Sequence, residues 1–372
     1  MQVKSKKKLK VFDLIALLLN CFFSLALLLS YLAPYADPKS FWVIAIIGVV
    51  YPFLLLANII FIIYWLFRVR HYSLISVICI LIGFNTATKY FGIRISNSTN
   101  QNCLPGNLRI MAYNVHNFIG LGTLHHTYIQ NQIFQLVNDE QPDIISMQEF
   151  SVNIANNKAI YSAAKKIMKS DQYYFKSYED SPWDSVGVAI FSRFPIVNHG
   201  IVLTPQDKYN DMQAIFVDIK CRNKIFRVYS LHLQPIHLSN QDHQYISKIR
   251  YKAIVNPHET KVIYAKLKVA FIKRSYQVET IKKNMDLCPY PYLITGDFND
   301  TPISFAVNQI SKGLKNAFIE KGSGLGTTYY GDFPHFQIDY ILASPQFDVI
   351  NYQTIRKKIS DHYAIVSDIK LN

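Results

Sequence analysis

The sequence predicts an α/β domain built on mixed β-sheet, preceded by an N-terminal region of membrane-spanning helices. Long apolar runs with very few charges fill the first ninety residues. From residue 108 onward, short apolar segments typical of buried strands are interspersed with helical stretches. Two of these strands are joined by the short turn CRNK and predict an antiparallel hairpin, whereas others flank a helix. Parallel and antiparallel strand pairs are therefore both expected.

The first part of the chain, residues 1–92, is expected to be a membrane anchor. A bilayer span needs about 20 apolar residues, and the expected transmembrane helices cover about residues 11–31, 41–67 and 73–90. The third is the weakest, because polar residues interrupt its second half. A cleaved signal peptide is the competing interpretation of the first run, but that run is too long and no small-residue cleavage site follows it.

Basic residues in the short loops predict the orientation of the anchor. Five lysines precede the first span, and Arg68 and Arg70 lie between the second and the third. Three spans then place the C-terminal domain on the non-cytoplasmic side of a plasma or inner membrane. If segment 73–90 does not cross, the domain faces the cytoplasm instead.

Residues 93–107 are polar, contain Gly and Pro, and predict a linker to a domain over residues 108–372. A helix is expected over 127–139, ending before Pro142, and much of 240–286 has helical character. The expected strands of this domain are 108–113, 143–148, 186–191, 213–219, 225–232, 292–296, 338–342 and 363–369.

The formal net charge of +14 divides evenly between the anchor and the domain. The domain is therefore mildly basic for its size, which suits an anionic substrate such as nucleic acid or a phospholipid head group. A solvated basic surface without meaning for the substrate is the alternative interpretation.

Acidic, amide and imidazole residues stand at the ends of the expected strands. Strands deliver such side chains to one rim of a sheet, and hard divalent cations prefer carboxylate and amide oxygens. A carboxylate can also serve as base for an attacking water, and cationic or donating groups can stabilise charge on phosphorus. The set therefore contains the parts for metal-assisted phosphoester cleavage. Its members are Asn114, Glu149, His232, Asp297, Asn299, Asp339, Asp361 and His362.

The motifs that carry these residues are RIMAYNVHNF, PDIISMQEF, VYSLHLQP, YLITGDFNDTP, FQIDYILAS and ISDHYAIV. In this order and spacing they resemble the endonuclease/exonuclease/phosphatase superfamily, which includes pancreatic-type deoxyribonucleases, abasic-site endonucleases, neutral sphingomyelinases and inositol polyphosphate 5-phosphatases. The resemblance covers residues from about 107 to the C-terminus and not the first hundred. It implies a four-layer α/β sandwich, two packed mixed β-sheets flanked by helices.

The resemblance also implies a bound Mg²⁺, for which Mn²⁺ could substitute because the ligands are hard oxygens. Glu149 corresponds to the principal metal ligand of the family. Asn114 corresponds to a residue that helps to hold the metal or the bound phosphate, and Asp361 is a candidate second contact.

The implied catalytic roles fall on five of the remaining residues. Asp297 corresponds to the group that orients and deprotonates water, and Asn299 contacts the phosphate. His232 donates to the phosphate or the leaving oxygen. His362 stabilises charge on the phosphoryl group, and the carboxylate of Asp339 beside it is expected to fix its tautomer and raise its pKa.

Arg274 lies on a helix that the family often places here and is a further candidate for substrate binding. The stretch 235–262 is longer than a minimal member needs, and it is either a substrate-recognition insertion or structural decoration. Gln337 replaces a basic residue of many relatives, which puts a local phosphate contact in doubt.

These expectations combine into a membrane-anchored, divalent-metal-dependent phosphodiesterase or phosphatase, acting by in-line water attack, possibly as an endonuclease or exonuclease. The alternative is a phospholipid or sphingolipid head-group phosphodiesterase of sphingomyelinase type. A non-catalytic scaffold is disfavoured, because the core positions are all present. The expected partners are the lipid bilayer and an anionic phosphoester substrate, and the sequence indicates no protein partner.

Overall fold

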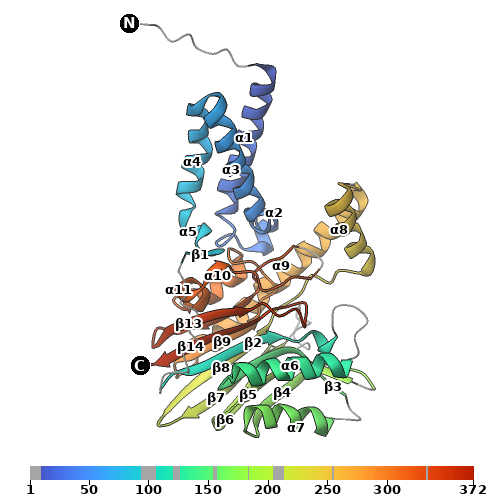
Figure 1. Ribbon diagram of the computed structural model, residues 1–372, viewed down its shortest axis with the longest axis vertical. Helices are drawn as coiled ribbons and strands as arrows, with labels where there is room; N and C mark the ends of the chain where they lie inside the picture. The colour runs from blue at the N-terminus through green and yellow to red at the C-terminus, as the bar shows by residue number, and fades with distance from the viewer. Residues whose placement is uncertain are drawn as a thin grey trace.

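The computed structural model consists of a helical bundle standing on one end of an α/β domain (Figure 1). Almost all of the expected linker over residues 93–107 lies outside the part of the chain that the structure describes. The described residues are 10–93, 106–119, 126–153, 157–182, 184–203, 213–253, 255–331 and 334–372.

The N-terminal region is helical throughout most of its length. Its helices are α1 (Val11–Ser30), α2 (Pro38–Val49), α3 (Tyr51–Arg68), α4 (Ser73–Ile82) and α5 (Phe84–Ala87), with a 3₁₀ turn, η1, at Arg70–Tyr72. Among the described residues, α1 and α3 are long and apolar enough to cross a membrane, whereas α2 and the segment Arg70–Ile82 are shorter apolar helices. Length and composition alone are weak evidence for membrane insertion.

The structure divides the helix that was expected over 41–67. The chain leaves helical geometry at Val50, between α2 and α3. Pro52 stands in the first turn of α3, where its missing N–H costs nothing, and a helix commonly begins at such a proline. As a result α2 lies at the base of the bundle next to the domain, while α3 runs back along α1 (Figure 1).

Polar side chains lie inside the bundle and bond to one another. The hydroxyl of Ser76 donates to the Asn20 side-chain oxygen at 2.6 Å, and that of Ser24 donates to the Asn58 oxygen at 2.8 Å. At the end of the bundle far from the domain, Arg68 pairs with the buried carboxylate of Asp13 at 2.8 Å. Many large apolar side chains of α1 and α3 point outward, although others, such as Leu27 and Trp65, are buried within the bundle.

Two six-stranded sheets pack face to face in the domain. The first has the strand order β13-β14-β2-β3-β5-β4 and the second β10-β12-β9-β8-β7-β6, and each contains one parallel pair, β2–β3 and β8–β9. The strands are β2 (Leu108–Asn114), β3 (Ile144–Asn153), β4 (Gln172–Asp180), β5 (Asp184–Ser192), β6 (Ile196–Leu203), β7 (Ala214–Cys221), β8 (Lys224–His232), β9 (Tyr292–Asp297), β10 (Lys315–Asn316), β12 (Asp339–Ala343), β13 (Phe347–Ile355) and β14 (Ala364–Leu371).

Helices cover the outer faces of both sheets, which confirms the expected four-layer sandwich. Helices α6 (His126–Glu140) and α7 (Asn157–Met168) pack on the first sheet, and α9 (Pro257–Asp286) and α10 (Phe305–Ser311) pack on the second. The central core between the sheets is made of β-branched and aromatic side chains, such as Ile110 and Val217. A further helix, α8 (Asn240–Lys252), precedes α9 and stands away from the sandwich (Figure 1).

All eight expected strands lie largely within observed strands, and the CRNK hairpin is the antiparallel pair β7–β8. Besides the very short β1 (Phe91–Ile93), β10 and β11 (Ser323–Leu325), three longer strands were missed: β4, β6 and β13. Two of them, β4 and β13, are outermost strands of the first sheet, and β6 is outermost in the second, so their side chains are only partly buried and carry a weak apolar signal. The expected helical stretch 240–286 is two helices, because Ala253 adopts a left-handed conformation and Pro257 starts α9.

The anchor and the domain are joined by direct contacts. The carboxylate of Asp37 accepts a hydrogen bond from Ser275 of α9 at 2.7 Å, and Lys39 forms an ion pair with Glu279 on the same helix. Strand β1 (Phe91–Ile93) pairs with β11 (Ser323–Leu325) of the domain. Ile303 of the loop after β9 packs into a cluster of bundle side chains. These contacts dock the bundle onto α9 and onto the loop that follows β9.

Candidate active site

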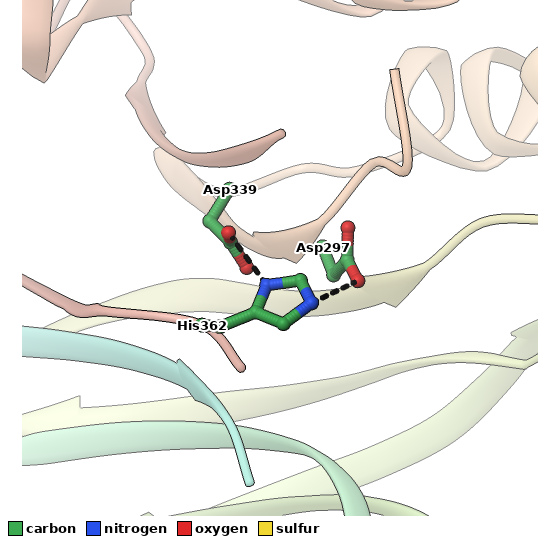
Figure 2. Close-up of side chains that lie close together, drawn as sticks. All are labelled: Asp297, Asp339 and His362. Atoms are coloured by element: carbon green, nitrogen blue, oxygen red, sulfur yellow. Dashed lines mark hydrogen bonds and ion pairs between the residues drawn. The ribbon is translucent and has the colours of Figure 1, made fainter. Parts of the chain in front are cut away.

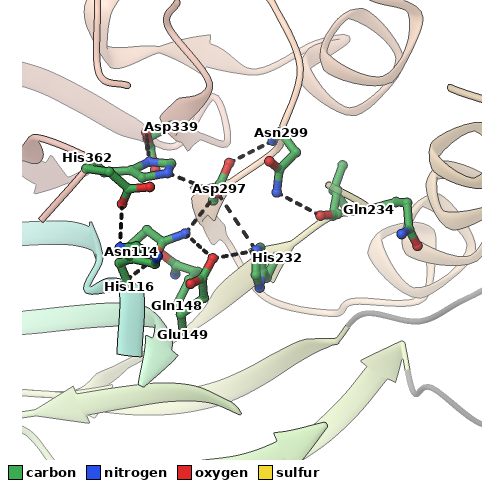
Figure 3. Close-up of polar contacts among 12 residues, drawn as sticks. Asn114, His116, Gln148, Glu149, His232, Gln234, Asp297, Asn299, Asp339 and His362 are labelled. Atoms are coloured by element: carbon green, nitrogen blue, oxygen red, sulfur yellow. Dashed lines mark hydrogen bonds and ion pairs between the residues drawn. The ribbon is translucent and has the colours of Figure 1, made fainter. Parts of the chain in front are cut away.

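Six of the expected site residues converge at one edge of the two sheets, as Figure 3 shows: Asn114, Glu149, His232, Asp297, Asp339 and His362. Asn114 ends β2, His232 ends β8 and Asp297 ends β9. The parallel register of β8 and β9 sets His232 beside Asp297, and the antiparallel register of β12 sets Asp339 on the other side of Asp297. The strand ends therefore bring together residues that are far apart in sequence.

Glu149 reaches this edge through an irregularity in β3. The register with β5 shifts between Met147 and Phe150, which is a β-bulge, and Glu149 has a φ of 51°. Bulges re-aim a side chain next to active sites, and a left-handed non-glycine residue stores backbone strain. The Glu149 side chain keeps 23% of its surface exposed, so it borders both the buried site and solvent.

Asn114 holds two carboxylates together. Its Nδ2 donates to Glu149 Oε1 and to Asp297 Oδ2, both at 3.0 Å. Its Oδ1 accepts the backbone N–H of His116 at 3.0 Å, and this contact fixes which way the amide faces. Asn114 thus offers its amino group to the site and not its oxygen, so the geometry favours a role in holding the carboxylates over the expected contact with metal.

Asp297 is buried at the centre of the site. Its Oδ1 accepts the backbone N–H of Asn299 at 2.7 Å. Burial raises the pKa of Asp297, and the nearby charge of Asp339 raises that pKa further. The preceding Gly296 has a φ of 124°, and a Cβ there would clash with the carbonyl oxygen of Leu231. Glycine therefore lets β9 approach β8 closely where Asp297 leaves the sheet.

His362 lies between two carboxylates (Figure 2). Its Nδ1 lies 2.9 Å from Asp339 Oδ2, and its Nε2 lies 3.8 Å from Asp297 Oδ2. Burial alone would lower the pKa of His362, but the charges of Asp339, Asp297 and Asp361 raise this pKa well above its ordinary value. The ring is therefore an imidazolium that carries an N–H on the side of Asp297.

His232 has the opposite electrostatic character. Its Nε2 lies 3.6 Å from Glu149 Oε1 and 3.9 Å from Asp297 Oδ2, and neither ring nitrogen has a hydrogen-bond partner among the described residues. Burial, followed by the charge of His362, lowers the pKa of His232 to about 3. A neutral imidazole with unpartnered nitrogens is suited to donate one hydrogen bond to an oxygen of a bound substrate.

Three expected residues lie at the margin of this cluster. Asn299, with a φ of 52°, donates from Nδ2 to the Leu233 carbonyl at 2.9 Å. The Oδ1 of Asp361 lies 3.6 Å from the His116 ring. Arg274 is only 1% exposed: its guanidinium pairs with Asp300 at 2.9 Å and donates to the backbone carbonyls of Gln234 and Asn299, so it braces the loop that carries Asn299 and Asp300.

The donor set fits a hard divalent cation. Glu149, Asp297, Asp339 and Asp361 supply four carboxylates, whereas His362 is the one imidazolium among these residues. Burial and, to a lesser extent, the charge of Asp361 raise the pKa of Glu149, whereas the hydrogen bond from Asn114 lowers it. Oxygen-rich, electronegative sites of this kind suit Mg²⁺ or Mn²⁺.

A second possible ligand group is Asp297, Asp339 and His362, whose ligand atoms lie within 4.8 Å of one another. The Nδ1 of His362 is already bonded to Asp339, and the raised pKa keeps the ring protonated, so it lacks a lone pair for a metal. Glu149 and Asp361 are then the residues of the cluster whose carboxylates could hold a cation.

A cavity of about 790 Å³ lies between α8 and the segments around Tyr330 and Lys358. One wall belongs to α8 and the other includes Tyr330, whose ring stacks on Tyr363 and whose N–H donates to the Asp361 carbonyl at 3.0 Å. Among the described residues its charged lining is basic: Lys248, Arg250, Lys252 and Lys358, with His243 and His335. Lys248, Arg250 and Lys252 fall within the stretch 235–262, which was expected to be either a recognition insertion or decoration, and Lys358 joins them only after folding.

Tyr178 and Tyr329 were also missed. The Tyr178 ring centroid lies 5.8 Å from that of His232, and the Tyr329 ring centroid lies 5.1 Å from that of His362. Neither residue stands in a polar motif, so only the fold reveals that they flank His232 and His362.

Two family models match the chain. The model described as "Endonuclease/Exonuclease/phosphatase family" matches residues 111–362, and a domain of unknown function matches residues 10–90. A search of curated proteins finds no match.

Solved structures share the fold at low sequence identity. A protein of this family from Bacteroides thetaiotaomicron is 19% identical with a TM-score of 0.51, over 72% of this chain and 99% of its own. A protein from Beutenbergia cavernae is 18% identical with a TM-score of 0.51, over 72% of both chains. The human nocturnin catalytic domain, with bound sulfate anion, is 17% identical with a TM-score of 0.50, over 73% of this chain and 97% of its own.

Proposed function

Because the chain belongs to the endonuclease/exonuclease/phosphatase family, whose members hydrolyse phosphoester bonds, we propose that it is a membrane-anchored, Mg²⁺-dependent phosphodiesterase acting on nucleic acid. The observation that carries this proposal is the convergence of Glu149, His232, Asp297 and the Asp339–His362 pair at one sheet edge. A scaffold without activity has no need to bury like-charged carboxylates around an unpartnered imidazole.

The side chains divide the work of an in-line displacement. Asp297, held by the Asn299 N–H and by Asn114, orients the attacking water and takes its proton, a task that its raised pKa favours. His362, kept cationic by Asp339, donates from Nε2 to the phosphoryl oxygens where charge develops. His232 and the second amide hydrogen of Asn299 are placed to bind the remaining oxygens.

Glu149 and Asp361 are the residues that would hold the divalent cation. When bound there, the cation supplies Lewis-acid stabilisation of the phosphate and the leaving oxygen. Asn114 donates a hydrogen bond to each of Glu149 and Asp297, so it holds the proposed metal ligand and the proposed base next to each other. Mn²⁺ is expected to replace Mg²⁺, because the donors are hard oxygens.

The basic cavity supports nucleic acid as the substrate. Its lining holds four Lys and Arg side chains and two histidines, and no acidic residue lines it among the described residues. A polyanionic strand whose scissile phosphate sits at His362 would place further phosphates against this lining. A choline head group is cationic and would find no counter-charge there.

The alternative substrate is an anionic phospholipid head group. The contact of α2 with α9 and the pairing of β1 with β11 hold the catalytic domain close to the anchor, and this favours a substrate that resides in the bilayer. An anionic head group, unlike phosphocholine, also suits the basic cavity.

A substrate panel on the full-length chain in lipid nanodiscs tests the proposal. It compares single-stranded and duplex DNA, RNA, phosphatidylinositol phosphates, sphingomyelin and a generic phosphodiester, each with Mg²⁺ and with EDTA. Metal-dependent cleavage of nucleic acid is expected. Cleavage of phosphatidylinositol phosphates alone would favour the alternative, and activity that survives in EDTA would overturn the mechanism.

A further inference from the structure

The helical hairpin formed by α8 and the first half of α9, residues 240–269, is the most outlying part of the domain. In Figure 1 α8 rises past the base of the bundle to the level of its lower half. The hairpin is rigid, because a capping box at Ser239 starts α8, Asp242 pairs with Lys266 across the two helices, and the Tyr245 hydroxyl donates to the Asn256 carbonyl at 2.9 Å.

This α8–α9 hairpin exposes apolar side chains at an unusual density. Fourteen large apolar residues of the described domain are exposed, and six of them fall between residues 249 and 269. They include Val255 at the turn, which is 65% exposed. The six are Ile249, Tyr251, Val255, Val262, Tyr264 and Val269. A group of exposed apolar side chains on the surface of a folded domain marks an interaction surface.

The same segment is basic. Residues 240–269 contain six Lys or Arg residues against two acidic ones, and one of the two acids, Asp242, is already paired with Lys266. Basic residues interleaved with exposed aromatic and aliphatic side chains are the composition of a helix that lies in a membrane interface. The pattern therefore points to an anionic bilayer surface.

The direction in which the hairpin faces agrees with this chemistry. Lys268 Nζ lies 4.9 Å from the ring centroid of Trp42, which stands on α2 at the base of the anchor. Lys261 and Tyr264 lie seven and four residues before Lys268, on the same helical face and further out along α9. The face of α9 that carries these three residues therefore extends from the contact with Trp42 into the region beside the bundle. If the bundle spans a bilayer, the bilayer surface lies in this region.

We propose that the α8–α9 hairpin docks on the surface of the bilayer, with its apolar residues in the interface and its lysines and arginines on anionic head groups. This rests on the membrane anchoring proposed above. Docking would hold the basic wall of the cavity, which α8 supplies, close to the membrane surface. Nucleic acid is the rival occupant of this surface, but it does not account for the exposed valines.

Hydrogen exchange of the full chain in nanodiscs tests the docking. Peptides covering residues 247–264 are compared in discs of phosphatidylcholine alone and in discs that also contain phosphatidylglycerol. Each basic residue near an anionic surface adds about fivefold to binding, so the hairpin is expected to exchange at least about fivefold more slowly in the anionic discs.

Two matched double variants sharpen the test. Val255→Asp with Lys261→Glu alters the hairpin outside the cavity and should abolish the lipid-dependent protection. Leu287→Asp with Lys283→Glu makes the same changes at the far end of α9, where Leu287 is 83% exposed, and should leave that protection intact. Both should hydrolyse a small soluble phosphodiester at the rate of the unmodified chain.

The outcomes separate this inference from the proposed function. Equal exchange in both lipids, in a chain that is inserted and active, would overturn the docking alone. Protection by single-stranded DNA in phosphatidylcholine discs, without protection by phosphatidylglycerol, would make the hairpin a nucleic-acid surface and overturn it as well. A chain that fails to insert would overturn both the anchoring and the docking, and inactivity toward every substrate in an inserted chain would count against the enzyme mechanism only.

Discussion

The bundle and the domain have opposite distributions of polarity. In the bundle, Leu18, Phe22 and Leu66 point outward while Asn20 and Asn58 are buried and hydrogen-bonded. In the domain the cores between and outside the sheets are apolar, and most charged side chains are on the surface. Water favours the second arrangement and hydrocarbon favours the first. The difference indicates that the two parts of the chain are adapted to different solvents.

The domain buries charge both as simple pairs and as a cluster. Arg227 and Asp218 form a buried ion pair at 2.6 Å, as Asp13 and Arg68 do in the bundle at 2.8 Å. In the cluster, by contrast, two carboxylates, Asp297 and Asp339, are buried around the single ring of His362. The cluster is therefore not a one-to-one ion pair, and this sets it apart from the other buried charges.

The largest effect is expected when the metal is removed. EDTA, or Glu149→Ala, should abolish phosphoester hydrolysis, because the carboxylates then repel the substrate phosphate without a counter-cation. Membrane insertion of the chain should be unchanged, because the site lies outside the bundle. Calorimetry measures the loss of metal binding, and hydrolysis assays measure the loss of activity. Full activity of Glu149→Ala would show that Glu149 does not hold the metal.

An all-or-none result is also expected from topology reporters. Three spans with a cytoplasmic N-terminus place the domain outside, so alkaline phosphatase fused after Asn107 should be active. A fluorescent protein that folds only in the cytosol should be dark at the same position. The reverse result would mean that α4 does not cross, and that the domain meets cytosolic nucleic acid or the inner leaflet.

Substitutions of the catalytic side chains should lower turnover by about 10²–10⁴-fold. Asp297→Asn removes the base, and His362→Ala removes the cationic donor. Circular dichroism should show a folded domain in each case. Asp339→Asn combined with His362→Ala should be far from additive, because Asp339 acts through His362. Additive losses would show that the two residues act separately.

A smaller effect is expected in the pH profile. Asp339, Asp297 and Asp361 raise the pKa of His362, so the imidazolium persists at neutral pH and activity should fall as pH rises through that pKa. Asp339→Asn removes one of these charges and should move the alkaline limb to lower pH. The same raised pKa means that the stability contributed by His362 is present below its unfolded pKa and is lost as pH rises through the folded one. If the alkaline limb of the pH–activity profile does not move in Asp339→Asn, that limb does not report the titration of His362.

The smallest effect concerns the polar interior of the bundle. Asn58→Leu removes the bonds to Ser24 and to the Leu54 carbonyl and should destabilise the bundle by about 0.6–2 kcal/mol. Hydrolysis of a soluble phosphodiester should be unchanged. Thermal unfolding in detergent measures the loss, with the lipid-facing Leu18→Ala as control. A clear loss of hydrolytic activity in Asn58→Leu at a temperature where the protein remains folded would show that the bundle influences the site.

Much of the domain could be predicted because its central strands are buried on both faces and therefore appear as apolar runs. The candidate site residues were predicted from the polar residues that end those runs, because a side chain can leave the core at the end of a strand. Glu149 was identified in this way, but the bulge that aims it was not, because a shift of register depends on the partner strand β5.

Other features depend on contacts that a linear pattern does not contain. The orientation of the Asn114 amide is set by the N–H of His116, a residue with no expected role. Arg274 was expected near the substrate, but its guanidinium lies against Asp300, which is distant in sequence. The break at Val50 was hidden because both sides of it are equally apolar.

The docking of α2 on α9 and the pairing of β1 with β11 have a kinetic consequence. A catalytic domain on a flexible linker can move through the solution around its attachment point. A domain docked on the bundle at two places stays at a constant distance from the membrane that the bundle is proposed to span. A substrate that resides in that membrane would then reach the site by lateral diffusion. The rate would follow the number of substrate molecules per unit area, and diluting the surface with inert lipid would slow the reaction even at constant bulk concentration.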